Sequence, residues 1–202
     1  MAAGGADDRC EAPAVRGRWR VAVLTVSDRC AQGLAEDTSG RWLQERARDL
    51  PGEVARAACL PDEPEQVAGW LRGTVDDLRP ALVLCTGGTG LHQRDRTPEA
   101  VLEVADYVVP GFGEAMRAAG LRHTPHGILS RQVAVVRGRS LVLALPGARR
   151  AVEESLDAVW AALPHALEMV AGLPGASLPA AHERGRGTGP GPSPATGATA
   201  GR

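Results

Sequence analysis

The sequence contains no lysine, so all 23 of its basic residues are arginine. This absence excludes the GxxxxGK[ST] phosphate loop, in which a lysine contacts the nucleotide phosphates. Any phosphate that the chain binds must be held by the planar guanidinium group of arginine or by backbone N–H groups. With 24 acidic residues the net charge is -1, which argues against nucleic acid as a partner and against an anionic membrane surface.

Cysteines are few and widely spaced. Cys10, Cys30, Cys59 and Cys85 show no CxxC spacing, and the five histidines show no metal-ligand or triad spacing, so a zinc site is not expected. The N-terminal stretch MAAGGADDRCEAP lacks the apolar core of a signal peptide, and no apolar run is long enough to span a bilayer. These absences predict a cytoplasmic protein.

Composition divides the chain into three parts. Residues 1–18 are small, polar and interrupted by glycine and proline, which predicts a flexible leader. Residues 173–202 are mostly Gly, Pro, Ala, Ser and Thr. Such a segment cannot bury enough apolar surface to offset the entropy lost on ordering, so we expect it to be disordered. A single domain over residues 19–172 remains.

Within this domain, short β-branched runs alternate with amphipathic segments. Strands are expected at 20–27, 53–60, 81–86, 132–138 and 140–147, and helices at 39–50, from Pro64 onward, at 97–105, 110–120, 148–162 and 164–171. Asp37, Thr38 or Ser39 can cap the first of these helices, and Thr97 can cap the third. The alternation predicts an α/β fold with a largely parallel sheet that helices cover on both faces.

The third strand ends in the loop TGGTG, residues 86–90. Ligands of parallel sheets bind where the loops leave the carboxyl ends of the strands. Glycines allow close approach of the backbone to a ligand, and consecutive N–H groups can bind an anion. A plain strand-to-helix turn has the same composition, and the loop alone does not distinguish the two.

Two carboxylates follow strands at the same predicted edge. Asp62 comes after the second strand and Asp95 lies behind the glycine loop, between Arg94 and Arg96. Together they can share Mg²⁺, which in turn bridges nucleotide phosphates. The alternatives are that Asp62 caps the helix that begins near Pro64 and that Asp95 pairs with its neighbouring arginines. Ser27 and Asp28 after the first strand are equally typical of a turn.

The chain resembles a known family, the molybdopterin adenylyltransferases of the Mog/MoaB type. Members of this family also occur as a domain of gephyrin-like proteins. The matching segments extend from about residue 20 to 172. The longest is TGGTG-x-x-x-RD-x-TPEA. The others are TVSDR with a downstream DTSG, LPDE, VPGFGEAMR, ILSRQ, LALPG and LPHALEMVAG.

The resemblance implies a three-layer α/β/α domain, commonly a homotrimer, that transfers the adenylyl group of MgATP to the terminal phosphate of molybdopterin. It also implies a later hand-off of the product to a molybdate insertase. Asp62 and Asp95 match the acids that this family uses with magnesium. The positions expected around the substrate and the nucleotide are Ser27, Asp28, Thr86, Gly87, Gly88, Thr89, Gly90, Thr97, Pro98, Glu99, Ser130, Arg131, Pro146 and Gly147.

One departure concerns the segment after the last strand. Relatives often carry Asn-Pro or Lys there, whereas this chain has LPGARRAV, so Arg149 or Arg150 must serve if a cation is needed. Two other functions stay open. One is a trimeric molybdopterin-binding scaffold with little or no catalysis, and the other is a generic α/β domain that binds a sugar nucleotide or phosphate. Retention of both Asp62 and Asp95 favours the enzyme, because a scaffold needs no metal site.

Overall fold

The computed structural model describes residues 14–15 and 18–173, and the strands in this part of the chain form one seven-stranded sheet. The order is β1-β2-β4-β7-β6-β5, and β3 also pairs with β2. The strands are β1 (Ala14–Val15), β2 (Arg18–Val26), β3 (Gly52–Leu60), β4 (Leu82–Thr86), β5 (Tyr107–Val108), β6 (Val133–Arg137) and β7 (Ser140–Leu145). The adjacent strands β3, β2, β4 and β7 are parallel, as predicted, whereas β1, β6 and β5 are antiparallel to their neighbours.

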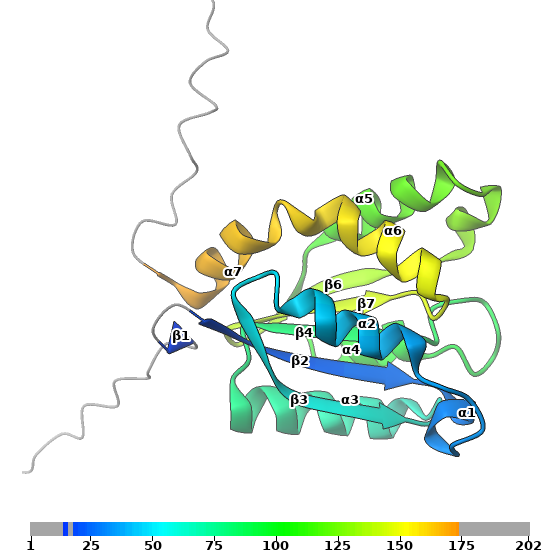
Figure 1. Ribbon diagram of the computed structural model, residues 1–202, viewed down its shortest axis with the longest axis horizontal. Coiled ribbons are helices and arrows are strands. Elements are labelled where there is room, and N and C mark those ends of the chain that lie inside the picture. Colours follow the sequence, from blue (N-terminus) through cyan, green and yellow to red (C-terminus); the bar gives the residue numbers. More distant parts are fainter. Residues whose placement is uncertain (1–13, 16–17, 174–202) are drawn as a thin grey trace, which may run out of the picture.

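Helices cover both faces of this sheet (Figure 1). They are α1 (Asp28–Ala31), α2 (Thr38–Ala47), α3 (Pro64–Gly73), α4 (Thr97–Glu103), α5 (Pro110–Leu121), α6 (Arg149–Trp160) and α7 (Leu163–Ala171), with the π-helix η1 (Thr74–Leu78) and the 3-10 helix η2 (Pro125–Leu129). In the described part of the chain, none of the helices is long and apolar enough to cross a membrane.

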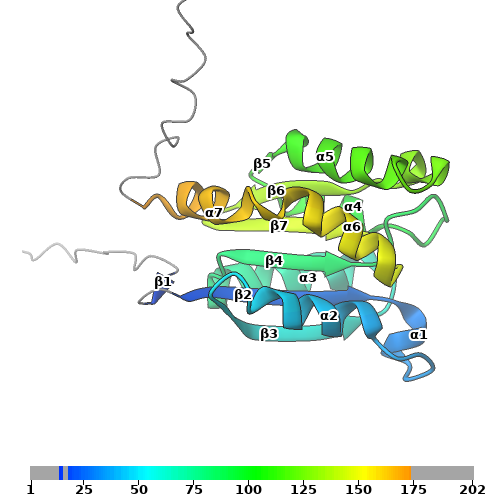
Figure 2. The same ribbon diagram turned by 45° about the horizontal axis from the view of Figure 1, so that its top comes forward.

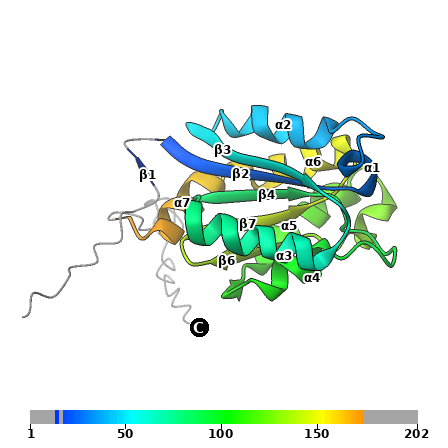
Figure 3. The same ribbon diagram turned by 90° about the horizontal axis from the view of Figure 1, so that it is seen from below.

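The two faces have separate hydrophobic cores because successive side chains of a strand point to opposite sides. In β2, Val21 and Val23 pack with α2, α5, α6 and α7. Ala22 and Leu24 pack instead with α3 and α4. Figure 3 shows α2 and α6 on one side of the sheet and α3 and α4 on the other. The expected three-layer α/β/α architecture is thus confirmed.

The predicted capping residue is confirmed for α2 and wrong for α4. Asp37 caps α2, since its Oδ1 accepts a hydrogen bond of 2.7 Å from the N–H of Gly40. The prediction that Thr97 caps α4 is wrong. Arg96 occupies the cap position and Thr97 is the first helical residue, with a buried hydroxyl that has no hydrogen-bond partner in the described structure.

The predicted leader and tail lie almost entirely outside the described residues. Of the leader, Ala14–Val15 pair with Arg18 and Trp19 as a short antiparallel strand. The domain limits of 19–172 therefore stay a prediction.

The carboxyl ends of the parallel strands meet at one edge of the sheet. Thr25 of β2 pairs with Thr86 of β4, and Thr86 pairs with Leu145 of β7, so three loops leave the sheet at the same level. Figure 2 shows α1 and the loop between β4 and α4 at this end. Because β6 is antiparallel, it begins here, and the N–H of Arg131 before it donates to the carbonyl of Thr89 at 2.9 Å.

Candidate active site

The glycines of the loop after β4 are required by its backbone. Gly87 and Gly88 have φ angles of 104° and 61°, in the left-handed region that glycine adopts without steric cost. A Cβ atom on Gly87 would lie 2.1 Å from the carbonyl oxygen of Val26, so no side chain fits there. The N–H of Gly87 donates to the carbonyl of Leu145 at 3.2 Å. This N–H is consequently already used within the fold, and Gly88 is the next donor in the loop.

The carboxyl edge of the sheet contains a cavity of about 340 Å³. Of the described residues that line it, four are acidic and none is basic. The acids are Glu36, Asp37, Asp62 and Asp95, and the other lining residues are Thr25, Val26, Ser27, Cys30, Thr38, Ser39, Thr86, Gly87, Gly88 and Gly147. Such a lining favours a cation, or an anionic ligand that arrives with one.

Two other cavities have a different chemical character. One of about 370 Å³ lies at the amino end of β3, where Arg48 and Glu53 are its only charged lining residues within the described chain. The other, of about 380 Å³, lies between α4, α5 and β6 and is lined largely by apolar groups. Neither brings two of the strand-end aspartates together, so we assign the site to the acidic cavity.

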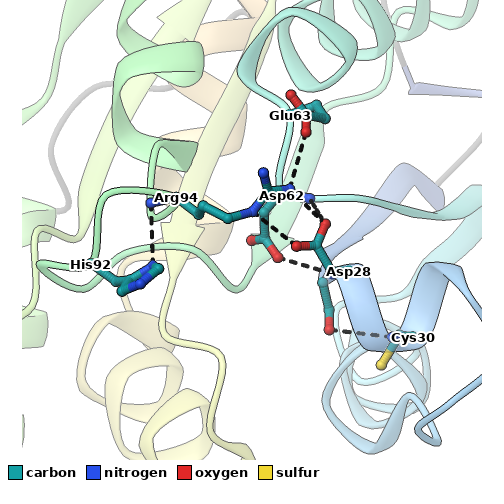
Figure 4. A network of polar contacts seen from close by, with 7 residues as sticks. Asp28, Cys30, Asp62, Glu63, His92 and Arg94 are labelled. Carbon is teal, nitrogen blue, oxygen red and sulfur yellow. Dashed lines mark hydrogen bonds and ion pairs between the residues drawn. The ribbon is translucent and has the colours of Figure 1, made fainter.

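Asp62 is held by the loop after β2. The N–H of Asp28 donates to Asp62 Oδ2 at 2.9 Å, and the N–H of Asp62 donates to Asp28 Oδ1 at 3.0 Å (Figure 4). The alternative that Asp62 caps α3 is wrong, because Glu63 is the residue at the cap position and the helix has no side-chain cap. Asp62 is thereby positioned by tertiary contacts at the rim of the cavity.

Asp95 is fixed by its own loop. Its Oδ2 accepts from the N–H of His92 at 3.0 Å, and its N–H donates to the carbonyl of His92 at 2.9 Å. A Cβ on Gly90 would lie 2.7 Å from Asp95 Oδ2, so the glycine makes room for the carboxylate. The alternative of pairing with Arg94 does not hold, since Arg94 binds Asp28 and Glu63 instead.

The surroundings of the cavity shift the pKa values of two acids, Asp62 and Asp28, in opposite directions. Burial raises the pKa of Asp62, and the neighbouring carboxylates of Asp28 and Asp95 raise it further. The pKa of Asp28 is lowered, first by its hydrogen bond from Arg94 and then by that from the N–H of Asp62. Asp62 and Asp95 thus repel each other across the cavity, and a bound cation would relieve this repulsion.

Another part of the lining comes from the segment that precedes and begins α2. Asp37 Oδ2 accepts a hydrogen bond of 2.7 Å from the hydroxyl of Thr25, and the hydroxyl of Ser39 donates to the carbonyl of Gly147 at 2.9 Å. From the sequence alone, Asp37 and Ser39 are expected only as possible caps of α2, whereas Gly147 is among the expected site residues. The available signal was the DTSG motif, which follows a strand as the other site loops do.

The structure divides the predicted site residues into three groups. Those that line the acidic cavity are Ser27, Asp62, Thr86, Gly87, Gly88, Asp95 and Gly147. Those that contact a lining residue or belong to its loop without lining the cavity are Asp28, Thr89, Gly90, Thr97 and Pro146. Those that border the apolar cavity beside α4 are Pro98, Glu99 and Arg131. Ser130 falls outside the three groups, since its N–H donates to the carbonyl of Gly127 and its buried hydroxyl has no partner in the described structure.

Basic residues near the site are engaged elsewhere. Arg131 donates through Nε to the carbonyl of Gly90 at 2.8 Å and through its two other nitrogens to Glu99 and to the carbonyl of Asp95. Arg149 and Arg150 pair along α6 with Glu153 and Glu154. None of the three lines the acidic cavity.

The donor set bears on whether a metal fits. Among the described residues there is no cluster of three or more His, Cys, Asp or Glu side chains that could hold a metal ion. Mg²⁺ commonly binds through one or two carboxylates together with substrate phosphates and retains several waters. The pair Asp62 and Asp95 fits a magnesium ion that arrives with a nucleotide.

Comparisons with known proteins give the family of this domain. A family model described as "Probable molybdopterin binding domain" matches residues 22–165. The molybdopterin adenylyltransferase of Helicobacter pylori is 39% identical over 155 residues, which cover 75% of this chain and 88% of that protein. A molybdenum cofactor biosynthesis bifunctional protein of Synechococcus elongatus is 43% identical over 150 residues, or 74% of this chain and 47% of that protein.

Solved structures add the same result at the level of the fold. The crystal structure of the molybdopterin biosynthesis enzyme MoaB from Thermus thermophilus matches with a TM-score of 0.73 and 49% identity, covering 77% of this chain and 98% of that one. Fold, motifs and family model coincide over the same residues, and the chain therefore belongs to the molybdopterin binding domain family.

Proposed function

We propose that this chain is a nucleotidyltransferase that transfers the adenylyl group of MgATP to the terminal phosphate of molybdopterin. The observation that carries the proposal is the position of Asp62 and Asp95, which come from separate loops and line one cavity with Gly88. Relatives named molybdopterin adenylyltransferase, similar over most of this chain, support it. The products are adenylylated molybdopterin and pyrophosphate.

In this reaction an oxygen of the terminal phosphate of molybdopterin attacks the α-phosphorus of ATP. The bond from the α-phosphorus to the oxygen that bridges to the β-phosphorus breaks, and pyrophosphate leaves with the electron pair. The protein has to hold attacking and leaving oxygens in line and to compensate the negative charge. Bound Mg²⁺ would supply positive charge at the phosphate oxygens.

Asp62 and Asp95 are the residues that would hold this ion. The N–H of Gly88, which lines the cavity, would donate to a phosphate oxygen, since the N–H of Gly87 is used within the fold. No basic side chain lines the cavity in the described part of the chain. Charge compensation therefore depends on the metal and on backbone N–H groups.

The test is direct. Purified protein is incubated with molybdopterin, ATP and Mg²⁺, and both pyrophosphate and adenylylated molybdopterin are measured. Product above a no-enzyme control is expected, and an ATP analogue with a methylene group between the α- and β-phosphorus should give none. Binding of molybdopterin without product would make the chain a binding scaffold. Absence of molybdopterin binding would contradict both functions.

The family resemblance also supports a cytoplasmic homotrimer that passes its product to a molybdate insertase. Light scattering coupled to size-exclusion chromatography tests the homotrimer, because a trimer has three times the mass of the chain. A monomer at concentrations used for the assay would contradict it.

A further inference from the structure

Arg94 directly precedes Asp95, yet its guanidinium group points away to two other loops. Its Nε donates to Asp28 Oδ2 at 2.9 Å, and its Nη2 donates to Asp28 Oδ1 at 2.8 Å. The same Nη2 donates to Glu63 Oε1 at 3.0 Å. Figure 4 shows the side chain extended from the loop after β4 towards the loops after β2 and β3. One arginine thus joins three loops.

Both partners of Arg94 are neighbours of Asp62. Glu63 follows it in sequence, and Asp28 exchanges two hydrogen bonds with it. Arg94 therefore connects the loop that carries Asp95 with the residues that surround Asp62. A bidentate contact of arginine with a carboxylate constrains direction as well as distance, so this connection defines how the two loops meet.

Arg94 is poorly placed to bind a phosphate itself. It does not line the acidic cavity, and two carboxylates already compensate its charge. A phosphate that recruited it would have to displace Asp28 or Glu63. The geometry is that of a brace between loops.

We propose that Arg94 is a positioning residue for adenylyl transfer, which holds the Asp95 loop against Asp62 so that both carboxylates face one metal position. This inference rests on the proposed function and names a residue that acts through others. Groups behind metal-binding carboxylates usually alter metal affinity about 10- to 100-fold when they are removed.

Arg96 supplies a matched control. It lies on the other side of Asp95, it is exposed, and it carries the same charge. Arg94→Ala and Arg96→Ala therefore remove one positive charge each next to Asp95, but only Arg94→Ala removes the contacts with Asp28 and Glu63.

The experiment compares Arg94→Ala, Arg94→Lys and Arg96→Ala with the wild type in the full chain. With ATP and molybdopterin saturating, Arg94→Ala should raise the free Mg²⁺ concentration for half-maximal turnover about tenfold or more. Arg94→Lys should recover only part of the loss, because an ammonium group cannot form the bidentate contact. Arg96→Ala should resemble the wild type, and the Kd of molybdopterin should stay unchanged in all three variants.

A second measurement does not depend on turnover. The backbone amides of Asp28 and Asp62 donate to each other's carboxylates, so NMR-detected hydrogen exchange at these two amides reports the junction. Exchange should accelerate in Arg94→Ala and not in Arg96→Ala. Should Arg94→Ala fail to fold, Glu63→Gln removes the negative charge of one of its two partners and should change amide exchange and Mg²⁺ dependence in the same direction, less strongly.

Two results would overturn the inference. One is a Mg²⁺ dependence and an amide exchange in Arg94→Ala equal to those in Arg96→Ala. The other is a raised KM for ATP at saturating Mg²⁺ with unchanged Mg²⁺ dependence, which would make Arg94 a phosphate ligand. If the wild type forms no adenylylated molybdopterin, the proposed function fails, whereas amide exchange still decides whether Arg94 joins the loops.

Discussion

Asp28 and Asp62 exchange hydrogen bonds in both directions, each donating its N–H to the carboxylate of the other, at 2.9 and 3.0 Å. The exchange uses Asp62 Oδ2. The second oxygen, Oδ1, faces the glycine loop, since a Cβ on Gly88 would lie 3.2 Å from it. Asp62 is therefore anchored through one oxygen and presents the other towards the cavity.

The first prediction follows from this division of roles. Asp62→Asn keeps an oxygen that can accept from Asp28 but loses the charge that holds a cation. We expect kcat to fall about a hundredfold or more, since loss of metal-assisted charge stabilisation costs several kcal/mol. Molybdopterin should still bind. The measurement is ATP-dependent turnover together with the Kd of the pterin.

Asp157→Asn is the control, because Asp157 is an exposed acid of α6 that pairs only with Arg46 in the described structure. Its turnover should match the wild type. Near-normal turnover of Asp62→Asn at the same Mg²⁺ concentration would contradict the metal role of Asp62.

A second prediction concerns two helical glycines. A Cβ on Gly40 in α2 would lie 2.2 Å from Thr25 Oγ1 and 2.3 Å from Asp37 Oδ2. Gly40→Ala should break the Thr25–Asp37 hydrogen bond and the helix cap, and lower the free energy of unfolding by about 2 kcal/mol or more. A Cβ on Gly69 in α3 would meet nothing within 4 Å. Gly69→Ala should therefore raise the free energy of unfolding by up to about 1 kcal/mol, because alanine favours a helix more than glycine does.

Urea denaturation of both variants measures these changes. Equal changes in unfolding free energy for the two substitutions would show that helix propensity alone determines the effect. The wall of the cavity would then not be tightly packed at Gly40.

The sequence predicts those site residues that directly follow a strand of the parallel sheet, because ligands bind at the carboxyl ends of such strands. It does not predict site residues that are equally typical of another role. Asp62 and Asp95 both line the cavity, as expected from loops at one edge of a parallel sheet. Ser39 was not predicted, because Asp, Thr and Ser before a helix are equally typical of capping. The hydrogen bonds from Thr25 to Asp37 and from Ser39 to the carbonyl of Gly147 place that segment at the cavity, and these contacts are not visible in the sequence.

Arg131 illustrates a different limit. Its motif predicted a place at the pocket, and it does lie at the correct edge of the sheet, because β6 is antiparallel and begins there. Its guanidinium, however, binds the carbonyls of Gly90 and Asp95 and the carboxylate of Glu99. Side-chain direction depends on which partners surround a residue in three dimensions, and spacing along the chain does not contain that information.

A third prediction uses the cysteine that lines the cavity. Cys30 lies among the cavity residues, whereas Cys85 in β4 is completely buried. Iodoacetamide should therefore modify Cys30 in the native protein and Cys85 only after unfolding. Saturating ATP, Mg²⁺ and molybdopterin should slow the modification of Cys30, as followed by peptide mass spectrometry. An unchanged rate in the presence of all three ligands would argue that they bind elsewhere.

The fourth prediction concerns stability at high pH. Burial raises the pKa of Cys85 from 9.0 to about 12, so the folded protein keeps this thiol protonated while the unfolded chain ionises it. The stabilising contribution is complete below pH 9.0 and is lost as the pH rises from there towards about 12. Between about pH 8 and pH 10 the wild type should lose about 1 kcal/mol more unfolding free energy than Cys85→Ala.

Comparing how the unfolding free energy of the wild type and of Cys85→Ala changes with pH isolates the contribution of the Cys85 thiol. Burial also raises the pKa of Cys59, to about 11, but that contribution is present in both proteins and cancels in the difference. The cavity left by Cys85→Ala lowers stability at every pH and cancels in the same way. Urea denaturation under reducing conditions gives both curves. Parallel curves would mean that the Cys85 thiol ionises as readily in the folded protein as in the unfolded chain, and that the core around β4 admits water.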